Sequence, residues 1–203
     1  MGVNRFMLLL ATLCLSVYGL QASPAGHQEK TFVAMVGFHC DLKNAAVNPD
    51  TIDLANIYNT LVNKVNELSK NKKFSISFHD DSRETVETPG KTNLFLNINI
   101  QFNTDPAKNG VDVFYSDDND YTFQSIKYAN IVVSEVKSSK LNLKVHGMIE
   151  SDMTKLKSAT GPALEVIMNL AGTREGAQVI TDENKLDALA KMIFECVERI
   201  SKS

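Results

Sequence analysis

Histidines with acidic neighbours are the side chains in this sequence best suited to chemistry. His39 and Asp41 follow one apolar run, and His79, Asp80 and Asp81 follow another. If these runs form neighbouring parallel strands, their carboxyl ends lie at one edge of a sheet, where open α/β sheets usually bind ligands. Two imidazoles and up to three carboxylates could hold a divalent metal such as Zn²⁺ or form an acid–base pair. The alternative is that they are ordinary loop residues, because their spacing matches no metal motif such as H-E-x-x-H.

An acidic turn is a second candidate for metal binding. Asp117, Asp118 and Asp120 surround Asn119 and could hold Ca²⁺ through their carboxylate oxygens. The turn lacks the spaced ligands and the closing Glu of a high-affinity calcium loop. The alternative is a solvated hairpin tip, because Asp and Asn are common in turns that bind no ion.

The first 22 residues predict a secretory signal peptide. Arg5 precedes an apolar run, residues 6–20, and small residues follow it. Cleavage after Ala22 is the preferred reading, and cleavage after Gly19 is the alternative. The run is shorter than the about 20 apolar residues that a membrane-spanning helix needs. We therefore expect a secreted protein, extracellular or in a bacterial periplasm, with no transmembrane segment after cleavage.

Export would leave two cysteines, Cys40 and Cys196, in a compartment where disulfides persist. We predict a bridge between them, and closing such a long loop would stabilise the fold by about 4–5 kcal/mol. The alternatives are two buried free thiols or a reactive cysteine. Because His39 adjoins Cys40, a thiolate nucleophile with an imidazole partner is also open.

The remaining sequence predicts a loose arm, residues 23–30, and one globular domain, residues 31–203. Residues 31–38 form an uncharged run that is typical of a strand covered on both faces. Asp50 is the expected N-cap of an amphipathic helix that extends to about Lys70, and residues 74–78 follow as a second strand. In one sheet, this strand–helix–strand unit would be parallel and right-handed.

The second half of the chain predicts an antiparallel meander followed by helices. Residues 93–102 alternate strictly, with Asn97, Asn99 and Gln101 on the side opposite the Leu and Ile residues, which indicates a strand with one wet face. The predicted fold class is therefore α+β with a mixed sheet in a single domain. The further predicted elements are a hairpin (111–116 and 121–126), strands (131–136 and 141–149) and helices (162–170, then 182–200 behind a Thr181 cap).

Charge and missing motifs narrow the function. Removal of Arg5 from the 21 Lys and Arg residues leaves 20 against 24 Asp and Glu, a net charge of −4, which opposes nucleic-acid binding. No glycine-rich phosphate loop, G-x-S-x-G elbow or C-x-x-C pair is present. We therefore predict a secreted binding or interaction domain with no cofactor and with an unknown protein or small-molecule partner.

Two further expectations accompany this main prediction. The alternative function is a small secreted metal-dependent hydrolase that uses His39, His79 and the neighbouring aspartates with one divalent metal ion. An antiparallel edge strand could also support self-association.

One family resemblance points the same way as the main prediction. The sequence VAMVGF at Val33–Phe38, the amphipathic helix and FSIS at Phe74–Ser77 resemble the opening of small envelope domains of the TolB N-terminal and outer-membrane assembly-factor kind. The resemblance implies a non-catalytic domain that binds partners in the cell envelope.

Overall fold

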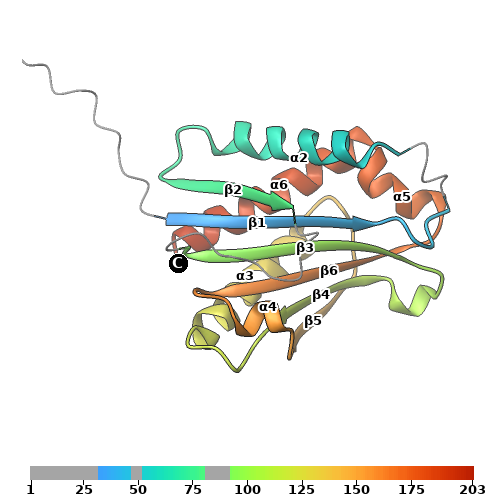
Figure 1. The fold of residues 1–203 in the computed structure, drawn as a ribbon. Coiled ribbons are helices and arrows are strands. Elements are labelled where there is room, and N and C mark those ends of the chain that lie inside the picture. Colours follow the sequence, from blue (N-terminus) through green and yellow to red (C-terminus); the bar gives the residue numbers. More distant parts are fainter. Residues whose placement is uncertain (1–31, 47–51, 81–91) are drawn as a thin grey trace, which may run out of the picture.

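One mixed sheet of six strands organises the structure, a computed structural model that describes residues 32–46, 52–80 and 92–203 (Figure 1). In chain order the elements are β1 (Phe32–Asp41), α2 (Leu54–Ser69), β2 (Phe74–Asp80), β3 (Leu94–Asn103), η2 (Pro106–Lys108), β4 (Gly110–Tyr115), α3 (Thr122–Ser138), β5 (Val145–Glu150), α4 (Thr154–Lys157), β6 (Ala163–Ala171), α5 (Arg174–Thr181) and α6 (Glu183–Ser201). The predicted signal peptide and arm lie outside the described residues. Within the described ranges, no helix is long and apolar enough to span a membrane.

The strands lie in the order β2-β1-β3-β6-β4-β5. β1 is parallel to β2 and β3, and β3 is parallel to β6, whereas β4 is antiparallel to β6 and parallel to β5. The predicted α+β fold, with a mixed sheet and a parallel opening unit, is confirmed. Because Gly110 at the start of β4 pairs with Asn169 near the end of β6, β4 begins at the edge where the parallel strands end.

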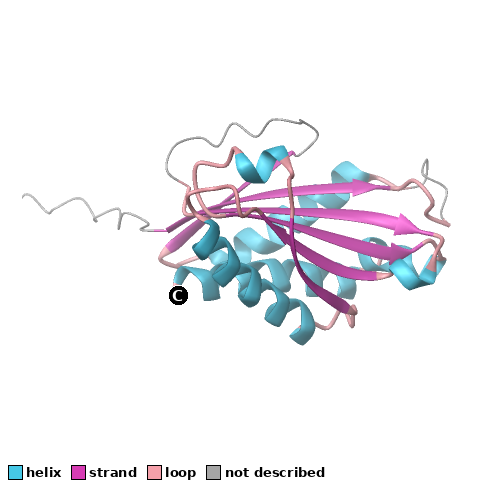
Figure 2. Ribbon diagram, turned by 90° about the horizontal axis from the view of Figure 1, so that it is seen from below, coloured by secondary structure: helices cyan, strands magenta, loops and turns pink. Residues whose placement is uncertain are grey.

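The long helices all pack on one face of the sheet. Figure 2 shows them together below the strands, and their buried side chains share one core with Ile98 and Ile100 of β3. Ile57, Leu61 and Val65 recur every four residues in α2, which places them on one stripe that faces the sheet. On the opposite face, α4 covers the amino-terminal half of the sheet, because its Leu156 packs in a second, smaller cluster. The carboxyl-terminal half of that face carries the polar side chains.

Several predicted elements of the second half differ from the structure. Residues 121–126 and 131–136 were expected as strands, but α3 contains residues 122–126 and 131–136, and its buried Ser125, Ala129 and Val132 follow the spacing of a helix. Residues 162–170 were expected as a helix, but Ala163 begins β6, which lies between two other strands and is buried along most of its length. The predicted meander is therefore replaced by strands that alternate with helices.

The predicted Cys40–Cys196 disulfide is wrong, because both residues are free thiols. Cys40 lies near the carboxyl end of β1. Cys196 lies in α6 two residues after Phe194, whose ring contacts Phe74 at the start of β2. Since Phe74 pairs with Phe32, the first residue of β1, the two thiols lie at opposite ends of the sheet.

Candidate functional site

A line of four paired residues crosses the sheet near its carboxyl edge, on the face opposite the long helices, which we call the open face. His39 of β1 is aligned with Asn99 of β3, Asn99 with Ile167 of β6, and Ile167 with Asp112 of β4. Paired residues on neighbouring strands point to the same face, so we call these four residues the edge row. At about 4.8 Å between strands, the Cα atoms of its two ends are about 14 Å apart.

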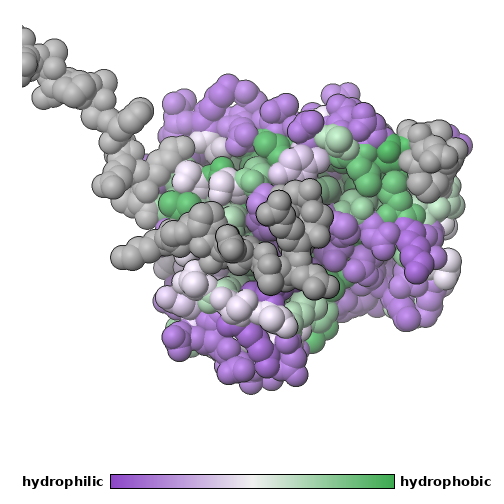
Figure 3. Space-filling view, in the orientation of Figure 1, coloured by the Kyte–Doolittle hydropathy of each residue, from purple (hydrophilic) through white to green (hydrophobic). Residues whose placement is uncertain are grey.

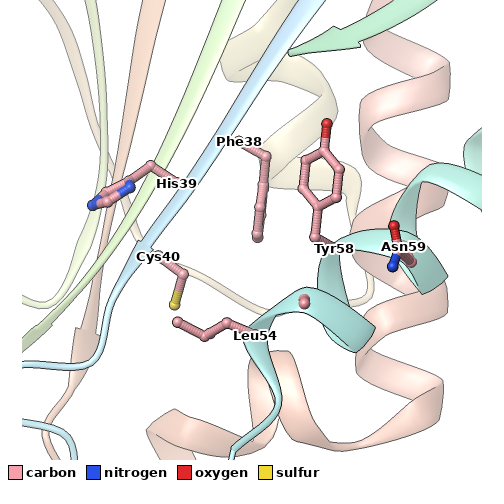
Figure 4. A pocket seen from close by; sticks show the side chains of 7 residues that line it. Phe38, His39, Cys40, Leu54, Tyr58 and Asn59 are labelled. Atoms are coloured by element: carbon pink, nitrogen blue, oxygen red, sulfur yellow. The ribbon is translucent and has the colours of Figure 1, made fainter. Parts of the chain in front are cut away.

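The edge row lies on the face opposite the long helices. Phe38 and Cys40, which flank His39 in β1, both pack against the core under the helices. Figure 4 shows His39 pointing away from Phe38, Cys40 and the α2 side chains Leu54 and Tyr58. The alternation predicted for residues 93–102 therefore holds, since Asn99 lies on the polar face and Ile98 lies in the core.

A His–Asp pair stands at the β4 end of the edge row. His146 Nδ1 lies 3.3 Å from Asp112 Oδ1, and their side chains are 26% and 16% exposed. The pairing of β4 with β5 is irregular between Val111 and Asp112, and such bulges turn a side chain out of its regular position. Gly110 has a φ of +150°, and a Cβ there would lie 2.7 Å from His146 Cε1 and Nε2. The imidazole ring therefore occupies the space that Gly110 leaves open.

The sequence analysis missed this pair because Asp112 and His146 belong to separate strands far apart in the chain. The glycines beside them were the available signal. A glycine inside a strand often marks a bulge or a close approach by another group, and Gly147 directly follows His146.

His79 lies on the same face but serves a packing role. Its ring stacks on Phe95 of β3 with 5.6 Å between ring centroids. To reach β3, His79 extends across β1 at Gly37, with which it is paired. A Cβ on Gly37 would lie 3.1 Å from His79 Nε2 and 2.2 Å from Asn97 Oδ1, so only glycine fits between the two side chains.

The predicted metal ligands do not come together in the part of the chain that the structure describes. There, no three His, Cys, Asp or Glu side chains lie close enough to hold a metal ion. Asp41 Oδ1 instead accepts a hydrogen bond of 2.9 Å from the Lys43 N–H and so stabilises a turn. Asp80 is the last residue of β2, and Asp81 lies outside the described residues.

A buried ion pair lies next to the edge row, two residues before it along β3 and β6. Glu165 of β6 is 1% exposed, and its Oε2 atom lies 2.7 Å from Lys155 Nζ. The Asn97 side-chain amide donates a second bond of 2.7 Å to the same oxygen. The sequence analysis did not identify this group, because Glu165 lies within residues 162–170, a mostly apolar run that was predicted as a helix. The group fixes β3, β6 and α4 beside the edge row.

The acidic turn connects β4 to α3 and is not a hairpin tip. Asp118 lies 3.4 Å from Lys157 Nζ, so a cation of the chain already faces its carboxylate. Asp117 faces Glu150, and repulsion between the two carboxyl groups raises the pKa of Glu150. The described residues show no group here that could hold a metal ion.

An apolar pocket of about 390 Å³ opens on the helix side of the same edge, between β1 and the start of α2 (Figure 4). Figure 3 shows hydrophobic surface at the end of the molecule where α2 begins. Cys40 lines the pocket, and burial, with a smaller effect from Asp41, raises the pKa of its thiol to about 12. A thiol with this pKa stays protonated near neutral pH, which argues against the Cys40 nucleophile.

A protein-family model and several solved structures match this chain. The family is described as N-acetylmuramoyl-L-alanine amidase, and its model matches residues 51–199. No curated protein matches.

Two of the matching structures illustrate the shared fold. The catalytic domain of CwlV, an N-acetylmuramoyl-L-alanine amidase from Bacillus (Paenibacillus) polymyxa var. colistinus, has a TM-score of 0.60 and 16% identity, over 84% of this chain and 98% of that one. The amidase AmiC2 of Nostoc punctiforme has a TM-score of 0.61 and 14% identity, over 85% of this chain and 98% of that one.

These matches correct the predicted function. A non-catalytic binding domain, which the envelope-domain resemblance also implied, is contradicted by the match to a hydrolase family over most of the chain. The alternative prediction, a small hydrolase, agrees better. The matched segment includes Asn99, Asp112, His146 and Ile167, whereas β1 with His39 precedes it.

Proposed function

The chain belongs to the N-acetylmuramoyl-L-alanine amidase family, and on that premise we propose that it hydrolyses the amide bond between N-acetylmuramic acid and L-alanine in peptidoglycan. The family match carries the proposal, because it spans three of the four strands that build the edge row. Proteins of this family usually act outside the cell or in the periplasm. The predicted signal peptide agrees with that location, and we propose that the protein is exported.

Zinc is the cofactor that this family implies, since its members typically depend on it. A catalytic zinc ion takes three protein ligands from His, Cys, Asp and Glu and keeps one open position. Only His39 and Asp112 of the edge row are of these types, and they stand at opposite ends of the row. The described residues therefore do not fit a catalytic zinc ion, and the proposed chemistry is assigned to the side chains themselves.

The His146 imidazole stands beside Asp112 on the open face. Asp112 holds His146 by its Nδ1 atom, which leaves Nε2 to accept a proton from water. The resulting hydroxide adds to the amide carbonyl carbon of the substrate. The His146 imidazole, which now carries that proton, then donates it to the alanine nitrogen as the C–N bond breaks. One water is consumed, and the products are a free carboxylate on the muramic acid and a free amino group on L-alanine.

Asn99 separates His39 from Ile167 in the edge row. Its side-chain amide can donate a hydrogen bond to a carbonyl oxygen of the bound substrate. The Asn99 Oδ1 atom is buried and finds no partner among the described residues. A donor on the substrate, such as a peptide N–H, could satisfy it.

The test is hydrolysis of purified peptidoglycan fragments by the exported protein, with products identified by mass spectrometry. The His146 imidazole should contribute about 10²–10⁴-fold as a general base and acid. We therefore expect His146→Asn to lower kcat by about 10²–10⁴-fold. Lys191→Ala, at an exposed position of α6 on the helix side of the sheet, is the control and should leave kcat unchanged. Absence of a new amino terminus on L-alanine with the wild-type protein would rule the proposal out.

A further inference from the structure

We infer that the edge row is an incomplete zinc site and retains no resident zinc. Asn99 and Ile167 follow His39 in the row and occupy the two positions where further zinc ligands would stand. The inference rests on the family assignment behind the proposed function, because only that family makes zinc the expected cofactor. It concerns metal content, and it can therefore be tested apart from hydrolysis.

The side chains next to His39 are of the wrong types for zinc. Asn99 presents a neutral amide, and Ile167 presents a hydrocarbon side chain. Zinc in proteins is bound by imidazole, thiolate or carboxylate groups. The nearest thiol, Cys40, faces the helix side of the sheet and packs against the core there. The other histidine of this edge, His79, is stacked on Phe95.

The backbone nevertheless has a geometry that suits a metal site. His39, Asn99 and Ile167 are paired across three parallel strands and point to one face. Their Cα atoms span about 10 Å, so side chains from the two outer strands can converge above the middle one. Asn99 and Ile167 are both partly exposed on this face, so larger or charged side chains there would still reach solvent. A change of side chains at two positions should therefore suffice to create zinc affinity.

The experiment compares the wild-type protein with the Asn99→His and Ile167→Glu double variant. Both proteins are stripped with EDTA, loaded with zinc sulfate, passed through gel filtration and analysed for metal by mass spectrometry. We expect the wild type to retain far less than one zinc per chain and the double variant about one. The dissociation constant for zinc should fall by at least about 100-fold, because outer-shell partners alone change it 10–100-fold. Cobalt should give the visible spectrum of a tetrahedral site only in the variant.

Two further variants show where the gained metal binds. His39→Ala in the double-variant background should abolish the gained affinity. Asn66→His, an equivalent substitution on the exposed face of α2, should gain none. If the double variant does not fold, as judged by circular dichroism, Asn99→Asp adds a carboxylate of nearly the same shape beside His39 and should tighten zinc binding less strongly.

Two results would overturn the inference. One is about one tightly held zinc per wild-type chain that is lost in His39→Ala. The other is a folded double variant with no more zinc affinity than the wild type. Neither depends on the proposed function: a zinc-free wild type that hydrolyses peptidoglycan supports both proposals, whereas an inactive zinc-free wild type removes only the function. A wild type that is active through zinc bound at His39 removes only this inference.

Discussion

Among single residues, Glu165 depends strongly on its partners, because its carboxylate is buried inside the sheet. Lys155 supplies its cation at 2.7 Å, and Asn97 donates a hydrogen bond of the same length. Lys155→Met would remove the ammonium group that pairs with this buried charge, which typically costs about 3–5 kcal/mol. We expect urea denaturation to show that loss. Adding Glu165→Gln to the same protein should recover part of it, because the buried charge is then gone.

Lys157, two residues along the same segment, is the control for this prediction. Its ammonium group pairs with Asp118 and Asp152, whose side chains are 75% and 94% exposed. Exposed ion pairs contribute little, so Lys157→Met should cost less than about 1 kcal/mol. Equal losses for Lys155→Met and Lys157→Met would show that burial of Glu165 is not the source of the effect.

At the scale of elements, α2 and α6 begin at aspartates that cap their first turns. Asp53 accepts a hydrogen bond of 2.9 Å from the Asn56 N–H, and Asp182 accepts one of 3.0 Å from the Lys185 N–H. Asp53→Ala should therefore lower the free energy of unfolding by about 1 kcal/mol. Asp53→Asn keeps an acceptor and should leave stability nearly unchanged. Similar losses in both variants, measured by urea denaturation, would contradict the capping role.

The elements that could be predicted from sequence are those with a clear period. β1, α2, β2 and β3 were expected within a few residues of their positions, because each has a continuous, helical or alternating apolar pattern. The α2 cap was placed at Asp50, whereas the structure has it at Asp53. Both residues are aspartates before the same apolar stripe, and local pattern alone does not distinguish them.

Elements with ambiguous patterns were predicted wrongly. The α3 sequence is rich in Ile, Val, Tyr and Phe, which favour strands, yet tertiary packing makes it a helix. β6 is short and mostly apolar, and such a run cannot be assigned to strand or helix by period alone. The position of Pro162 directly before it favoured a helix start in the prediction.

The candidate site was predicted in part. Its position at the carboxyl edge and the polar face of β3 followed from strand patterns. The partners of His39 could not be predicted from the strand patterns, because the register across β1, β3 and β6 depends on contacts between segments far apart in the chain. The pairing of His146 with Asp112 likewise needs β5 to lie parallel to β4, whereas a meander would have made neighbouring strands antiparallel.

For the molecule as a whole, the helices lie on one face of the sheet, so the residues that stabilise the fold and the residues of the candidate site lie on different faces. Helices α2, α3, α5 and α6 and one face of the sheet share a single large core. The edge row lies on the other face, where substitutions disturb few core contacts. We therefore expect single substitutions of edge-row side chains, and of His146 beside them, to leave the fold intact.

The same layout fixes the state of the two cysteines. About eight residues of β1, at about 3.3 Å each, separate Cys40 from the end of the sheet where Cys196 lies, whereas a disulfide needs Cα atoms within about 7 Å. We therefore expect the purified protein, denatured without reductant, to be alkylated at both cysteines, as shown by peptide mapping. In the native protein both should react slowly, because burial raises the pKa of each thiol. A peptide pair linked through Cys40 and Cys196 before reduction would contradict this arrangement of α6 and β1.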